Sequence, residues 1–206
     1  MEKTKHTVEL ASIDFEQALK YLGYRNMTLD DSMEDLLESC QSEVINSARP
    51  SFVYQVHDYK DGVIKDSSFV LEGKTIIDHL SECDKVIMLC VTLSGGIDAL
   101  IRRKQISQMA AAAVIDSLAS YAVDQVCDMA LSIIMKDYAN YEMTYRYGIG
   151  YGDFPLENQQ KFLDALNAGR LLGVSTSDSH MLIPTKTVTC IIGLGHNIEP
   201  SKKANI

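Results

Sequence analysis

The sequence has little of what marks a membrane or secreted protein. It contains only four prolines, and it has no run of 18 apolar residues that could cross a bilayer as a helix. Residues 1–7 are polar, include two lysines and are not followed by the apolar core of a signal peptide. We therefore expect a cytoplasmic protein that does not associate with membranes.

Clustered positive charge is also scarce. The chain has 19 Lys and Arg against 28 Asp and Glu, which gives a formal net charge of −9. Its tight basic cluster, Arg102-Arg103-Lys104, falls on the solvent face of an expected helix. Binding to a phosphate backbone depends on clustered Lys and Arg, so we expect no nucleic-acid partner.

The five cysteines are scattered through apolar stretches, and none forms a C-x-x-C pair. This pattern indicates buried free thiols. His79 and Cys83 lie one helical turn apart, but no second pair of ligands accompanies them. A metal site needs a larger set of ligands, so we expect none.

Repeats, low-complexity tracts and linkers rich in proline, glycine or serine are missing as well. With 206 residues and 46% hydrophobic residues, the chain can bury one ordinary core. We therefore predict a single domain, in which a helical segment at residues 1–50 belongs to the same unit as a core at residues 51–206.

Hydrophobic periodicity predicts helices and strands without a regular βαβ alternation. Asp14 should cap the first helix, Thr28 the second and Asp153 the last, for which Gly169 is the expected stop. We expect helices at 14–23, 28–49, 73–83, from 97, at 105–140 and at 156–168, and strands at 52–59, 63–71, 85–93 and 187–192. The run at 85–93 suits a buried central strand. The fold class is therefore α+β, with a mixed or antiparallel sheet.

The segment 145–155, here called the glycine-rich turn, holds three glycines within five positions. Such a stretch makes a poor helix or strand, so its backbone is used for its shape or its bare amides. Arg146 begins it and can hold a carboxylate through two parallel hydrogen bonds. From these residues alone two interpretations remain open: a helix end with Arg146 paired to a surface carboxylate, or a cleft for a flat ligand.

Two blocks resemble a known family. The first is Arg146-x-x-x-Gly150-Tyr151, which runs on into Gly-Asp-Phe-Pro-Leu, and the second comprises Thr176-Ser177-Asp178-Ser179, Met181, Pro184 and Thr187-Val188-Thr189. Together they are similar to the activation domain of cobalamin-dependent methionine synthase, over roughly residues 108–195. The resemblance implies a single curved α+β domain in which helices flank a twisted antiparallel sheet.

The resemblance also implies a ligand, S-adenosylmethionine, in a shallow surface groove. Arg146 would hold the carboxylate of its methionine part, and Gly148, Gly150 and Tyr151 would contribute backbone amides and carbonyls. Three departures from the family pattern concern the ligand contacts. Ser120 stands where the family has a glutamate, with Asp116 and Asp124 one turn to either side; Ile191-Ile192 replaces a late tyrosine; and residues 1–50 offer no aligned acidic ligand.

The implied function is reactivation of methionine synthase by reductive methylation of cob(II)alamin. S-adenosylmethionine would give the methyl group, a flavodoxin-like or ferredoxin-like donor the electron, and a cobalamin-binding methionine synthase or related corrinoid protein, on a separate polypeptide, the metal centre. No side chain of this chain is expected to be catalytic. Two alternatives stay open: activation of another corrinoid methyltransferase, and a module that binds S-adenosylmethionine or a corrinoid without turnover.

Overall fold

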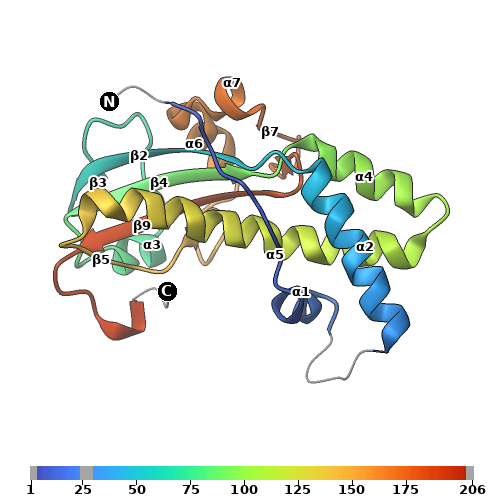
Figure 1. Ribbon diagram of the computed structural model, residues 1–206. Helices are drawn as coiled ribbons and strands as arrows, with labels where there is room; N and C mark the ends of the chain where they lie inside the picture. Colours follow the sequence, from blue (N-terminus) through green and yellow to red (C-terminus); the bar gives the residue numbers. More distant parts are fainter. Residues whose placement is uncertain (1–3, 24–29, 203–206) are drawn as a thin grey trace.

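The computed structural model describes residues 4–23 and 30–202, which are built around an antiparallel sheet (Figure 1). Its strand order is β1-β2-β4-β9-β5, with β3 paired to β2 and β6 paired to β9. The strands are β1 (His6–Thr7), β2 (Ser51–Lys60), β3 (Val63–Ile64), β4 (Lys85–Thr92), β5 (Glu142–Met143), β6 (Tyr147–Gly148) and β9 (Thr187–Gly195). A separate two-stranded sheet pairs β7 (Ser175–Thr176) with β8 (Leu182–Ile183).

The strand β4 lies between two long neighbours and is buried on both sides. Leu89 pairs with Tyr54 of β2 and with Cys190 of β9. Because side chains alternate along a strand, its residues contribute to two apolar layers. Ile87, Leu89 and Val91 enter one layer, and Val86, Met88 and Cys90 enter the other. The predicted buried strand at 85–93 and the predicted last strand are both confirmed.

Helices cover both faces of the sheet. The helices are α1 (Phe15–Tyr21), α2 (Asp31–Ser47), α3 (Lys74–His79), α4 (Gly95–Gln105), α5 (Met109–Ile134), α6 (Asn158–Leu166) and α7 (Ala168–Leu172), with 3₁₀ turns at Met135–Tyr138 and Pro200–Lys202. The first apolar layer holds side chains of α1, α2, α4 and α5, and the second holds those of α3, α6 and α7. The α+β class with an antiparallel sheet flanked by helices is confirmed; the division at residue 50 stays a prediction.

The longest helix, α5, extends along the sheet and past its end, where α2 and α4 pack on it (Figure 1). Its length and composition alone would also suit a membrane span. Leu118, Ala122 and Val126 are fully buried against the sheet and the neighbouring helices, as in the core helix of a folded domain. The predicted start at 105 is wrong, because α4 continues to Gln105 and a turn separates the two helices.

The helix caps predicted from the sequence are partly correct. Asp14 caps α1, with its carboxylate accepting the backbone N–H of Gln17 at 3.2 Å. Thr28 lies outside the described residues, and the cap of α2 is Asp30, which accepts the N–H of Met33 at 2.9 Å. The predicted strand 63–71 is only two residues long, because Asp66 adopts a left-handed conformation with φ of 55°.

The predicted helix at 156–168 is shorter, and its cap is different. It forms α6 from Asn158 to Leu166, and the residue before it, Glu157, makes no side-chain cap. Gly169 is not a stop but lies inside α7. Asp153 caps another helix, α3, which is far away in sequence.

Candidate functional site

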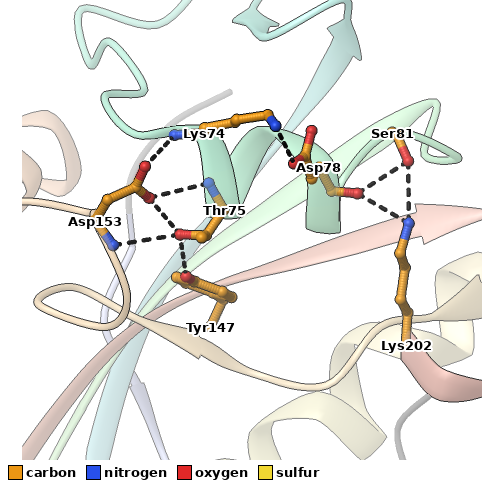
Figure 2. A network of polar contacts seen from close by, with 7 residues as sticks. All are labelled: Lys74, Thr75, Asp78, Ser81, Tyr147, Asp153 and Lys202. Carbon is orange, nitrogen blue, oxygen red and sulfur yellow. Dashed lines mark hydrogen bonds and ion pairs between the residues drawn. The ribbon is translucent and has the colours of Figure 1, made fainter.

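The glycine-rich turn is attached to the start of α3 (Figure 2). The carboxylate of Asp153 accepts the backbone N–H of Lys74 at 2.7 Å and that of Thr75 at 2.9 Å, and the Thr75 hydroxyl also donates to it. These donors, led by the hydroxyl, lower the pKa of Asp153 to about 2. Gly73 occupies the cap position of α3 and has no side chain to accept the first N–H groups of the helix, so Asp153 accepts them instead.

Tyr147 adds a second attachment within the same network. Its ring is buried, and its hydroxyl donates to the Thr75 hydroxyl oxygen at 2.6 Å (Figure 2). Tyr147 and Gly148 also form β6, which pairs with β9 at Ile191 and Cys190. The turn is therefore fixed to the sheet on one side and to α3 on the other.

The far end of α3 is held too. The ammonium group of Lys202 donates to the carbonyl oxygen of Asp78 at 2.9 Å and to the hydroxyl of Ser81 at 3.1 Å (Figure 2). A short helix gains little stability from its own hydrogen bonds. Contacts at both termini therefore keep α3 in place as the support of the turn.

A pocket of about 520 Å³ opens beside the glycine-rich turn. Its floor includes Thr187, Thr189 and Cys190 of β9. Tyr151 and Met181 line it from the rim, where both side chains are largely exposed. The size lies in the range of small-molecule sites.

Arg146 lines this pocket and contacts two carboxylates of α5. Its Nη2 lies 3.3 Å from Asp124 Oδ1, and its Nη1 lies 3.0 Å from Asp128 Oδ1. Burial lowers the pKa of Arg146, but Cys127, Asp128 and Asp124 raise it by more, so the guanidinium stays charged. The sequence left open whether Arg146 pairs with a surface carboxylate or lines a ligand cleft. In the structure it does both, because it is paired with two carboxylates and faces a pocket.

Of the other three predicted site residues, Gly148 and Tyr151 line the pocket. A Cβ at Gly148 would lie 2.7 Å from the Tyr151 ring, so a glycine allows the ring to fold back over the turn. Gly150 does not line the pocket; its φ of 93° favours glycine, and a Cβ there would point at the Leu156 side chain. Gly150 therefore shapes the turn from behind.

The acidic residues that flank Ser120 have separate places. Asp116 forms an ion pair with Lys186 at 2.8 Å, and the Ser120 hydroxyl accepts from the same ammonium group. Asp124 lines the pocket and is the one of these three that contacts Arg146. Ile191 and Ile192 are fully buried, one on each side of the sheet.

Sequence reasoning missed Gln159, which lines the pocket although it is only 2% exposed. Its Nε2 donates to the hydroxyl of Thr189 at 2.6 Å. A signal was present, because Gln159 shares a helix face with Phe162 and Leu163 three and four positions on. A polar residue on a buried stripe is a reason to look for a site.

Within residues 4–23 and 30–202, no three His, Cys, Asp or Glu side chains gather in a way that could hold a metal ion. His79 Nε2 instead lies 3.1 Å from the carbonyl oxygen of Tyr145, and its ring packs against that tyrosine. Cys83 is buried as a free thiol.

Comparisons with known proteins agree with this geometry at the level of the fold. No family model and no curated protein matches the chain by sequence. Among solved structures, the chain is similar to the crystal structure of the MetH reactivation domain bound to AdoHcy, with a TM-score of 0.71 and 12% identity over 100% of this chain and 81% of that one. The chain therefore has the fold of that domain, a curled antiparallel sheet with helices.

Proposed function

We propose that this chain binds S-adenosylmethionine beside Arg146 and presents its methyl group for reductive methylation of cob(II)alamin in methionine synthase. The observation that carries the proposal is a charged guanidinium facing a pocket that the glycine-rich turn lines. Support comes from the similar fold of a domain whose structure holds AdoHcy, the demethylated product of S-adenosylmethionine.

The charges around Arg146 suit the amino-acid end of the ligand. Arg146 would hold its carboxylate, and Asp124 its ammonium group, so both ends of a zwitterion meet an opposite charge. One guanidinium beside two carboxylates leaves the cluster with one net negative charge. An incoming cation would compensate this charge while the carboxylate replaces part of the present contacts of Arg146.

The remaining contacts would come from the turn and the floor. Gly148 and Tyr151 would lie along the ligand, with Gly150 keeping the turn in its left-handed conformation. The exposed rim at Tyr151 and Met181 leaves the pocket open to a second macromolecule. A methyl group bound there would face outward.

The chemistry needs positioning from this chain. Cobalamin, held by the methionine synthase or a related corrinoid protein, would supply the nucleophilic metal centre, and a flavodoxin-like or ferredoxin-like protein the electron. Residues of the pocket would bind the methyl donor and orient it toward the partner. No acid, base or nucleophile of this chain is required.

Calorimetric titration with S-adenosylmethionine tests the proposal. Replacing Arg146 with Ala should cost about 2–4 kcal/mol of binding free energy, because a charged two-point contact is lost. Arg102→Ala, at the exposed end of α4, is the matched control and should bind like the wild type. Equal binding by Arg146→Ala, or no binding by the wild type, would overturn the proposal.

A second candidate is a module that binds S-adenosylmethionine without turnover. This candidate is favoured by Ser120, whose hydroxyl accepts a hydrogen bond from Lys186 and does not line the pocket. A reactivation assay with cob(II)alamin methionine synthase, reductant and S-adenosylmethionine separates the two functions, since only the first gives restored activity. The same assay with other corrinoid methyltransferases tests whether one of these is the partner.

A further inference from the structure

The N-terminal helix reaches the ligand site through one side chain. Tyr21, the last residue of α1, donates its hydroxyl to Asp124 Oδ2 at 2.6 Å, across 103 positions of sequence. The other oxygen of the same carboxylate, Oδ1, faces Arg146 Nη2 at 3.3 Å. Asp124 is therefore held between a residue outside the pocket and a residue that lines it.

The segment that carries Tyr21 is firmly docked. Ala18 and Leu19 are buried in the apolar layer beneath α5. The buried hydroxyl of Ser117 donates to the carbonyl oxygen of Ala18, and Gln125 Nε2 donates to that of Ser12 at 3.3 Å. Tyr21 thus extends from the end of an anchored helix, and its side chain, on a residue that is 55% exposed, reaches Asp124 at the surface.

The contact between Tyr21 and Asp124 affects the phenol as well. The hydrogen bond to Asp124, followed by burial and the charge of that carboxylate, raises the pKa of Tyr21 to about 12. The phenol therefore remains a proton donor throughout the neutral range.

We propose that Tyr21 is a positioning residue, which holds Asp124 in the orientation that receives the ammonium group of the ligand. The inference rests on the proposed function and extends it to α1. Without the hydroxyl, the Asp124 side chain, which is 32% exposed, can rotate or turn wholly to Arg146. The carboxylate would then have to be reordered when the ligand binds, at a cost in affinity.

The test compares two ligands. S-adenosylmethionine has the ammonium group, whereas 5′-methylthioadenosine keeps the nucleoside and lacks the amino acid. Tyr21→Phe should weaken S-adenosylmethionine on the order of tenfold and leave 5′-methylthioadenosine unchanged. Tyr54→Phe, a tyrosine of β2 packed beside Phe52, is the matched control and should change neither.

Asp124→Asn completes a double-mutant cycle. Adding Tyr21→Phe to Asp124→Asn should cause no further loss of affinity for S-adenosylmethionine. The cycle therefore tests the role of Tyr21 even where 5′-methylthioadenosine binds too weakly to measure. Unchanged S-adenosylmethionine binding by Tyr21→Phe, an equal loss for both ligands, or additive effects in the cycle would overturn the role of Tyr21. Absence of binding by the wild type would instead overturn the proposed function, and with it this extension.

Discussion

Thr75 and Asp153 lie 78 positions apart, yet Asp153 accepts hydrogen bonds from both the backbone N–H and the hydroxyl of Thr75. An aspartate that directly follows three closely spaced glycines would ordinarily be assigned as the cap of the next helix in the chain. Here it caps an earlier one, and it ties the turn that lines the pocket to a helix of the second apolar layer. The shape of the site thus depends on a long-range contact.

The pH dependence of stability should report this contact. The pKa of Asp153 falls from an ordinary 3.8 to about 2, so its stabilising effect is present above about pH 4 and is lost as the pH falls toward 2. Urea unfolding of the wild type and Asp153→Asn should show a difference in unfolding free energy that is constant near neutral pH and shrinks in this window. Thr75→Val should give a smaller difference; a difference that persists at about pH 2 would contradict the assignment.

Replacement of Gly148 by Ala should separate binding from folding. The new Cβ would lie 2.7 Å from the Tyr151 ring, which is 65% exposed and can swing away, so the unfolding free energy should change by less than about 1 kcal/mol. The displaced ring would disturb the pocket wall, and S-adenosylmethionine should bind on the order of tenfold more weakly.

The control for this substitution is Gly169→Ala in α7, where a Cβ would meet only ordinary contact, 3.5 Å from the carbonyl oxygen of Val174. It should leave the affinity unchanged. Calorimetry and thermal unfolding measured on both variants decide the matter; a Gly148→Ala variant that binds as tightly as the wild type would show that the ring position is irrelevant to the ligand.

Core packing predicts a large loss of stability when Phe162 is truncated. Its ring is fully buried in the second apolar layer and meets the Phe69 ring edge-on at a centroid distance of 5.2 Å. Phe162→Ala should lower the unfolding free energy by about 3–5 kcal/mol because it leaves a cavity. Ile106→Ala, at a side chain that is 85% exposed, should stay within about 0.5 kcal/mol in the same urea titration.

The cysteines should resist alkylation in the folded protein. All five are buried, and burial raises the pKa of Cys83 to about 11 and that of Cys190 to about 12, so thiolate is scarce at about pH 8. Mass spectrometry after iodoacetamide treatment should find little modification in native buffer and five modified cysteines in urea. Rapid native labelling of Cys190, which lines the pocket, would contradict the packing of the floor.

The features that could be predicted from the sequence are those that depend on the local pattern of residues. The apolar run at Lys85–Thr92, the β-branched last strand and the presence of a long helix at α5 were predicted, because their hydrophobic patterns follow directly from burial, whereas the start of α5 was not. Asp14 was identified as a cap because its partner, Gln17, lies three positions away. The glycine-rich turn was recognised because three glycines in five residues suit no regular element.

What the sequence did not predict depends on contacts across the fold. The helix that Asp153 caps and the tyrosine that holds Asp124 are set by packing between distant segments. Strand β3 ends early because of backbone geometry at Asp66, which no alternation of apolar residues reveals. Gln159 was overlooked because a single polar residue on an apolar stripe is a weak signal by itself.

The floor of the pocket is part of β9, which pairs with β4 from Thr187 to Leu194 at the centre of the sheet. Substitutions in the floor of the pocket should therefore lower the stability of the whole domain before they change ligand binding. Residues 180–181 and the side chain of Tyr151 lie outside that central pairing. Side chains at these positions of the pocket can accordingly vary at little risk to the folding of the domain.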